Sequence, residues 1–312
     1  MRSLIMSNPE TISTFEFFQK FPNEEAARKF FETKRWGNEP VCGHCGSVDV
    51  SECKDHKPMP YRCKDCRKHF SVRTGTVLAE SRLPLIKWLL AIYMLTSARK
   101  GIPSTQMARE LGVTQKTAWF LAQRIRETWL KGRNDDMDGQ VQVDETYVGG
   151  KAANKHANQK DGKRGMSGKV AVMGMRDQNG RVVAKPVKNT KRTTVHSFIA
   201  DNAALGSTVV TDQFAAYFGI EAVGYRHIRI NHSVGEYVKE MAHTNGIESF
   251  WSLLKRGYVG IYHYMSAKHL HRYVKEFSFR HNTAQIGTMD FIGMTIDRMV
   301  DKRLTYKGLI NG

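Results

Sequence analysis

The chain has 312 residues, of which 41% are hydrophobic and 25% charged, as in a globular protein large enough for more than one domain. Its charge is unusual, because 48 lysines and arginines against 30 aspartates and glutamates give a formal net charge of +18. This excess favours a polyanionic partner over a basic surface without function. The longest apolar run, residues 83–98, contains Lys87 and is too short to span a bilayer, which argues against a membrane protein.

The cysteines and the N-terminal residues indicate where the protein acts. No sustained apolar segment follows the first methionine, so we expect no secretory signal. Four of the five cysteines form two close pairs, which suits metal binding in a reducing compartment better than disulfides. We therefore expect a cytoplasmic protein with no membrane partner.

Residues 1–35 are expected to form an N-terminal helical segment. Residues 12–34 have helical character with a break near Pro22, and Asn23 is placed to cap the second helix. Phe30 and Phe31 give this helix an apolar face, and we assign it no chemistry.

Residues 36–76 are expected to form a small zinc ribbon. Two C-x2-C pairs, with seventeen residues between them, provide four thiolates for one structural Zn2+ ion: Cys42, Cys45, Cys63 and Cys66. A redox C-x-x-C pair is the alternative, but no βαβ pattern surrounds either pair. His44, His56 and His69 are further candidate ligands, although four cysteines already close a tetrahedral site. A closed site has no open position for substrate, so the zinc should stabilise the fold rather than catalyse.

Residues 77–133 are expected to form a helix-turn-helix region that binds DNA. After a helix that begins near Pro84, a short helix ends at Gly112 and a second one begins after Thr114. The apolar positions of the helix pair leave four side chains for bases or phosphates: Gln115, Lys116, Thr117 and Gln123. The alternative is an ordinary helical hairpin with no DNA contact.

Residues 139–290 alternate between strands and helices and predict an α/β domain with a ribonuclease H-like mixed sheet. Strands are expected at 140–148, 169–177, 181–187, 207–212 and 226–231, and helices at 193–203 and 245–259. This order matches the ribonuclease H-like succession if one helix is shortened or lost. Residues 149–169 form a Gly-, Lys- and Asn-rich insertion that cannot bury a core.

Three carboxylates come from three separate elements of this domain. Asp144 lies within the first strand between valines, Asp212 ends the fourth strand, and Glu248 lies in the first turn of a helix. Taken singly, Asp212 is explained as a turn residue and Glu248 as a helix N-terminal charge, whereas Asp144 is harder to explain because acids are depleted within strands. Together they predict a site for two Mg2+ or Mn2+ ions, because divalent cations offset the repulsion between carboxylates.

Other side chains are expected around these acids. Lys255 follows Glu248 by seven residues, about two helical turns, so both lie on one face, with Arg256 close by to contact DNA phosphate. Glu145 should point to the opposite face of the strand from Asp144, as a surface or supporting residue; the alternative is that the two acids exchange roles. His243 and Asn245 are candidates to orient a metal-bound water, or equally to cap the helix.

The pattern as a whole resembles a known family. Thirty-five residues separate Asp212 from Glu248, as in the D-D-35-E pattern of transposases and retroviral-type integrases. The order of the blocks "RWGNEPVCGHCGS", "VDETYVGG", "TDQFAAY" and "HTNGIESFWSLLKRGYVGIYHYMSAKHL" is similar to insertion-sequence transposases of the IS1595 (ISXO2-like) group. The resemblance covers roughly residues 15–290. The first cysteine pair departs from it by having Gly43-His44 where relatives often have a proline.

The resemblance implies a zinc ribbon, a helix-turn-helix region and a DDE catalytic domain whose acids match Asp144, Asp212 and Glu248. It also implies binding of terminal inverted repeats, Mg2+-dependent strand cleavage and transfer to target DNA, and a homo-oligomer assembled on DNA ends. The alternatives are a DNA-binding transcriptional regulator without catalysis and a ribonuclease H-like nuclease that does not join strands. Residues 291–312 form a C-terminal tail to which the sequence assigns no role.

Overall fold

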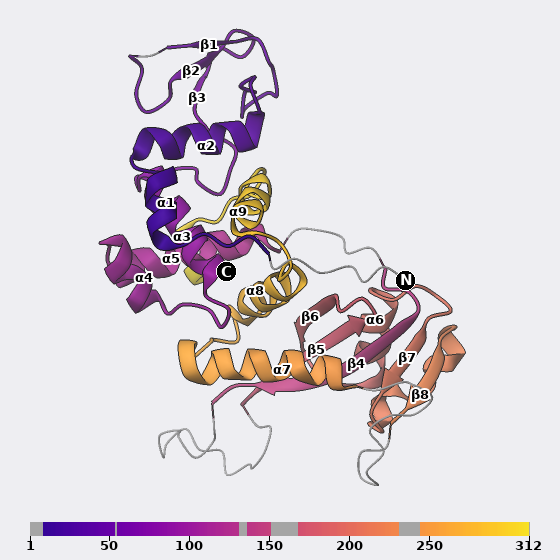
Figure 1. Ribbon diagram of the computed structural model, residues 1–312. Coiled ribbons are helices and arrows are strands. Elements are labelled where there is room, and N and C mark those ends of the chain that lie inside the picture. Colours follow the sequence, from indigo (N-terminus) through magenta and orange to yellow (C-terminus); the bar gives the residue numbers. More distant parts are fainter. Residues whose placement is uncertain (1–8, 54, 131–135, 151–167, 231–243, 312) are drawn as a thin grey trace, which may run out of the picture. The chain divides into compact units, whose positions relative to one another are not determined.

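A computed structural model describes residues 9–53, 55–130, 136–150, 168–230 and 244–311 of the chain. The chain divides into two compact units (Figure 1). The first combines residues 1–131 with residues 283–312, and the second consists of residues 132–282. Each unit has its own secondary structure.

The first unit is helical apart from a small antiparallel sheet. Its helices are α1 (Thr14–Lys20), α2 (Glu24–Trp36), α3 (Leu85–Ser97), α4 (Ser104–Leu111), α5 (Gln115–Thr128), α9 (Thr288–Asp297) and α10 (Tyr306–Asn311). The sheet has the order β1 (Val50–Glu52), β2 (Tyr61–Cys63) and β3 (His69–Phe70). Trp36 at the end of α2 contacts the rings of Tyr61 and Phe70 edge-on, so this helix packs against the ribbon.

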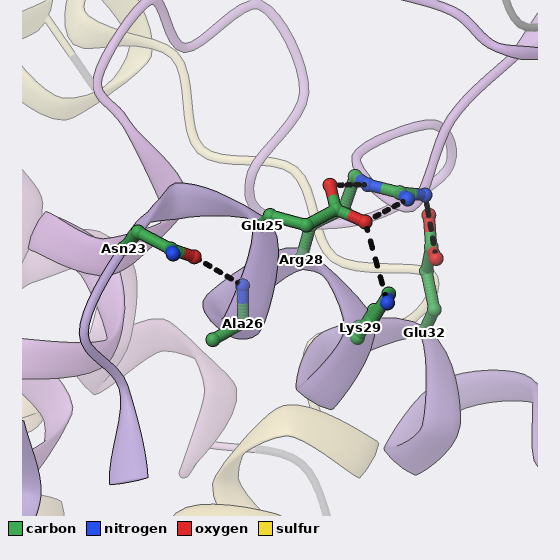
Figure 2. Close-up of polar contacts among 6 residues, drawn as sticks. All are labelled: Asn23, Glu25, Ala26, Arg28, Lys29 and Glu32. Carbon is green, nitrogen blue, oxygen red and sulfur yellow. Dashed lines mark hydrogen bonds and ion pairs between the residues drawn. The ribbon is translucent and has the colours of Figure 1, made fainter. Parts of the chain in front are cut away.

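Helix α2 begins as its sequence predicts. The Oδ1 atom of Asn23 accepts a hydrogen bond from the backbone N–H of Ala26 at 2.9 Å, which confirms Asn23 as the N-cap (Figure 2). Further along the helix Arg28 forms ion pairs with Glu25 and Glu32, both at 2.7 Å. These pairs lie three and four residues apart, the spacing that places side chains on one helical face.

Helices α4 and α5 form the predicted helix pair. Gly112 ends α4 in the left-handed conformation with φ of 59°, which an L side chain adopts at a cost. Thr114 caps α5 by accepting a hydrogen bond from the backbone N–H of Thr117 at 3.2 Å. The sequence therefore predicted both the turn and the start of α5 correctly.

The C-terminal residues return to the first unit, which the sequence did not indicate. Trp129, just after α5, is fully buried and donates from Nε1 to Thr295 Oγ1 in α9 at 3.2 Å. Tyr306 in α10 lies edge-on to Phe120 of α5, with ring centroids 5.5 Å apart. Residues 283–312 are thus part of the fold around α5.

The second unit is built on a mixed five-stranded sheet. Its strands are β4 (Gln140–Val148), β5 (Val170–Asp177), β6 (Val182–Val187), β7 (Thr208–Thr211) and β8 (Arg226–Arg229), in the order β6-β5-β4-β7-β8. The pairs β4/β5 and β5/β6 are antiparallel, while β4/β7 and β7/β8 are parallel. This is the ribonuclease H-like arrangement that the succession of elements predicted. Two 3-10 turns, at 215–217 and 220–223, stand where the shortened helix was expected.

Helices cover both faces of this sheet, and each face has its own core. On one face α6 (Arg192–Ala200) buries Val195, Phe198 and Ile199 against β4, β5 and β7. The other face is covered by α7 (Asn245–Gly257) and α8 (Leu270–Asn282), as Figure 1 shows for α7. Alternate residues of β4 therefore face α6 and α7.

Candidate active site

Two hydrogen bonds hold the carboxylate of Asp144 in β4. Its Oδ2 accepts from Trp251 Nε1 in α7 at 3.0 Å, and its Oδ1 accepts from the backbone N–H of Glu145 at 2.8 Å. Gly174 of β5 pairs with Asp144 across the sheet. A Cβ atom at Gly174 would lie 2.5 Å from two ring carbons of Trp251, Cη2 and Cζ2. The absence of a side chain there gives the indole its place beside Asp144.

The carboxyl group of Asp144 is also crowded by negative charge. Burial, followed by the charges of Glu145 and Asp212, raises its pKa to about 7. Burial also raises the pKa of Glu145, although Tyr217 donates a hydrogen bond to Glu145 Oε2 at 2.6 Å and partly offsets that rise. A cation placed among these carboxylates would therefore be favoured.

Asp212 directly follows β7 and lies close to Asp144. The parallel register pairs Gln142 with Val210, and each acid is two residues beyond its member of that pair. Asp212 Oδ1 accepts a hydrogen bond from the backbone N–H of Phe214 at 2.9 Å, which forms the turn after the strand. The turn does not use Asp212 Oδ2, so Asp212 can both form the turn and offer an oxygen to a metal ion.

Glu248 is exposed on the first turn of α7. Its Oε1 accepts from Thr244 Oγ1 at 2.7 Å, and α7 is anchored to the sheet because Gln142 Oε1 accepts from the backbone N–H of Ile247 at 3.0 Å. A cleft of about 560 Å³ opens beside these residues. Its charged lining residues are Asp144, Glu145, Glu248, Lys255 and Arg256.

Asp144 and Glu248 line the same cleft and the charge of Asp212 acts on Asp144, but the three acids do not form a compact ligand cluster. Within the described part of the chain, only one group of three or more ligand side chains has its atoms within 4.8 Å of one another, and that group is made of cysteines. The acids nevertheless fit a hard divalent cation, because every donor is an oxygen and because burial and the charges of Glu145 and Asp212 already raise the pKa of Asp144.

The four cysteines of the ribbon form a compact cluster. Cys42 Sγ lies 3.7 Å from Cys66 Sγ, and Cys45 Sγ lies 3.6 Å from Cys63 Sγ. The backbone N–H of Cys66 donates to Cys63 Sγ and lowers the pKa of that thiol to about 7. Four sulfurs at these separations fit one tetrahedral zinc ion, as the C-x2-C spacing predicted. Cys53 lies outside the cluster.

Sequence profiles of known families match both regions. Residues 136–282 match the ISXO2-like transposase domain, and residues 22–69 match the transposase zinc-ribbon domain. Together these matches cover more than half of the chain. The chain belongs to the ISXO2-like transposases. The predicted DDE-type fold and ribbon are thereby confirmed at the level of the family.

Two curated proteins are similar to this ISXO2-like transposase. An uncharacterized protein in transposable element ISH50 of Halobacterium salinarum is 29% identical over 272 residues, which is 83% of this chain and 91% of the relative. An uncharacterized transposase-like protein of Haemophilus influenzae is 29% identical over 106 residues, which is 34% of this chain and 85% of the relative. None of the helices that the structure describes has the length and apolar character to cross a membrane.

The residues predicted to contact DNA on α5 have different surroundings. Gln115 and Lys116 are exposed at the start of the helix, and Thr117 is half-buried beside them. Gln123 is fully buried, so the expectation that it faces outward is wrong. The sequence pattern treated α5 as half of a two-helix hairpin, whereas the C-terminal segment also packs along this part of the unit.

The two residues expected to support the acids from the start of α7 have different outcomes. His243 lies outside the described residues. Asn245 is exposed as the first residue of α7, and it is Thr244 that contacts Glu248.

Sequence reasoning missed Trp251, Gly174 and Tyr217. Trp251 follows Glu248 by three residues, so helical spacing places both on one face of α7. That spacing is a signal that was available in the sequence. The pairing of Gly174 with Asp144 and the contact of Tyr217 with Glu145 depend on long-range packing, and no local pattern indicates them.

Proposed function

We propose that this protein binds the terminal inverted repeats of an insertion sequence, cleaves the strands at the element's ends and joins their 3′-hydroxyls to target DNA. The support is one arrangement, in which acids and cations line the same cleft. Asp144 and Glu248 share it with Lys255 and Arg256, and Asp212 is close enough to raise the pKa of Asp144. Carboxylates that hold cations beside side chains that hold phosphate are what phosphoryl transfer requires.

Asp144, Asp212 and Glu248 would hold two Mg2+ or Mn2+ ions, which when bound supply activation of the attacking oxygen and neutralise charge at phosphorus. The hydrogen bond from Trp251 fixes the orientation of Asp144, and the hydrogen bond from Thr244 does the same for Glu248. These contacts limit the motion of both acids before DNA arrives.

Two successive displacements at phosphorus follow from this assignment. In cleavage, a water oxygen bonds to the phosphorus at the element's end while the bond to the 3′-oxygen breaks. In joining, the 3′-hydroxyl so formed attacks a target phosphodiester and displaces the target's 3′-oxygen. Lys255 and Arg256, both exposed on α7, bind the non-bridging oxygens of the phosphate in each step.

The first unit supplies recognition in this proposal. Gln115, Lys116 and Thr117 on α5 contact the end DNA, and the ribbon, stabilised by one zinc ion, provides a second contact surface. Because two ends must be joined, the protein assembles as a homo-oligomer on DNA, in the cytoplasm where that DNA lies.

The experiment compares wild-type protein with Asp212→Asn and with Asp201→Asn, in the presence of Mg2+ and duplexes from the element's ends. Asp201 is an exposed acid paired with Lys185 at 3.2 Å and serves as the matched control. We expect Asp212→Asn to bind end DNA but to lose cleavage and strand transfer, while Asp201→Asn retains all three. Equal strand transfer by Asp212→Asn would remove Asp212 from the site. Cleavage without joining by the wild type would favour a nuclease, and binding without cleavage a regulator.

A further inference from the structure

A short segment of the first unit, residues 71–82, connects the zinc ribbon to α3 and is held rigidly. Three arginines donate to backbone carbonyls within it: Arg35 to Val72 at 2.7 Å, Arg73 to Ser81 at 3.1 Å, and Arg124 to Ala79 at 2.7 Å. Trp88 Nε1 also donates to the hydroxyl of Ser81 at 3.1 Å. A guanidinium has five N–H groups, so these bonds leave donors free for a further ligand.

Two hollows meet at this segment and form one groove, here named the ribbon–helix groove. The larger, about 1170 Å³, has His44, Lys68, His69 and Arg73 in its wall; the smaller, about 350 Å³, has Thr117, Phe120 and Arg124. Both are lined by Glu80, Ser81 and Arg82. The two hollows therefore adjoin at residues 80–82, between the ribbon and the start of α5.

The charge of the groove suits an anion along its whole length. Its cations are Lys68, Arg73, Arg82 and Arg124. Its one carboxylate, Glu80, is paired outside the groove with Arg303 at 2.8 Å. The cations are spread along the groove, so a chain of anions matches them better than a single small one does.

Arg124 is buried at the smaller hollow, where it has a hydrogen bond and ring contacts but, among the described residues, no ion pair. Only 7% of it is exposed, and its guanidinium lies over the rings of Trp88 and Phe120, 5.1 and 5.4 Å from their centroids. Among the residues that the structure describes, no carboxylate is within ion-pair distance of Arg124, and its Nε has no hydrogen-bond partner. Burial lowers the pKa of Arg124 to about 10, and the charge of Glu80 opposes that shift.

We propose that the ribbon–helix groove holds the sugar–phosphate backbone of one strand of the end DNA, so that the ribbon and α5 contact adjacent stretches of the same duplex. The inference rests on the proposed function for the identity of the DNA. Phosphates would give Arg82 and Arg124 close counter-charges, and backbone contacts would set the register of α5 on the duplex.

The test uses full-length, zinc-loaded protein with Lys68→Ala, Arg82→Ala and the double variant. Both side chains are exposed, so the changes should not disturb folding. Lys29→Ala on α2 is the matched control, because Lys29 is an exposed cation, 3.8 Å from Glu25, that lines neither hollow (Figure 2). Fluorescence anisotropy over a salt series measures affinity for an end duplex and for an unrelated duplex.

A plot of log K against log salt concentration becomes less steep by about 0.9 for each phosphate contact that is lost. We therefore expect the slope to be less steep by about 1 in each single variant and by about 2 in the double variant, and to be unchanged in Lys29→Ala. Ethylation interference should show that the double variant loses phosphates between those protected by the ribbon and those protected by α5. If all three variants kept the wild-type slope on a duplex that the wild type binds, the groove assignment would be wrong while the proposed function would stand.

Two further outcomes separate the alternatives. If the wild type binds the unrelated duplex as well as the end duplex, recognition of inverted repeats fails, while the slopes on either duplex still judge the groove. If the variants lose affinity for a poly-glutamate peptide but not for duplexes, the groove binds an acidic protein segment and the proposal is wrong. If the wild type binds no duplex, both proposals fall.

Discussion

Replacing Asp144 by asparagine should make the metal-free second unit more stable at alkaline pH. The pKa of Asp144 is raised to about 7 from an ordinary value of 3.8, chiefly by burial. A carboxyl with a raised folded-state pKa keeps its proton longer in the folded chain than in the unfolded chain. Stability therefore falls as pH rises from about 4 to about 7, and it stays low above 7.

The size of this effect follows from the shift. A difference of about 3 pH units corresponds to about 4 kcal/mol at 1.4 kcal/mol per unit, which is a ceiling. Asp144 retains some contact with solvent in the cleft, so we expect about 2 kcal/mol after screening. The NH2 group of asparagine cannot accept a hydrogen bond, so Asp144→Asn keeps only one of the two N–H contacts of the carboxyl and loses about 1 kcal/mol at any pH. We therefore expect the variant to be about 1 kcal/mol less stable than wild type at pH 4.5 and about 1 kcal/mol more stable at pH 8.

The measurement is urea unfolding of the full-length protein, read by hydrogen exchange in β4 and β5, at pH 4.5 and 8 without divalent cations. Mg2+ added at pH 8 should then stabilise the wild type and not the variant. Asp201→Asn, which removes an exposed carboxylate from the same unit, controls for the loss of one charge. A variant no more stable than wild type at pH 8, or a gain of equal size at both pH values, would refute the reasoning.

Three other substitutions test contacts around the two sites. Gly174→Ala should displace the Trp251 indole and destabilise β5 by about 1–3 kcal/mol, with loss of strand cleavage; unchanged indole fluorescence and activity would contradict this. Tyr217→Phe removes the bond to Glu145 and should cost about 1–2 kcal/mol at pH 8, and less at low pH where Glu145 is protonated; a pH-independent loss would contradict it. Cys63→Ser should release zinc and unfold residues 42–70, seen as faster hydrogen exchange there, while Cys53→Ser should not.

The sequence alone determined those features that depend on residues close together in the chain. Two C-x2-C pairs bring four thiolates together because each knuckle is a local turn. Short runs of strand-forming residues placed β4 to β8 to within a few residues, and capping residues placed α2 and α5. The three acids could be named because their elements and their spacing were already visible.

Only the tertiary structure decided what surrounds those acids and how α5 is covered. Trp251 is beside Asp144 because Gly174, on another strand, leaves room for it, and cross-strand pairing is set by the packing of a whole sheet. Tertiary packing also buries Gln123, although the pattern of α5 predicted that its side chain is exposed. Contacts between residues far apart in sequence depend on which faces the folded chain brings together, so a local sequence pattern does not predict them.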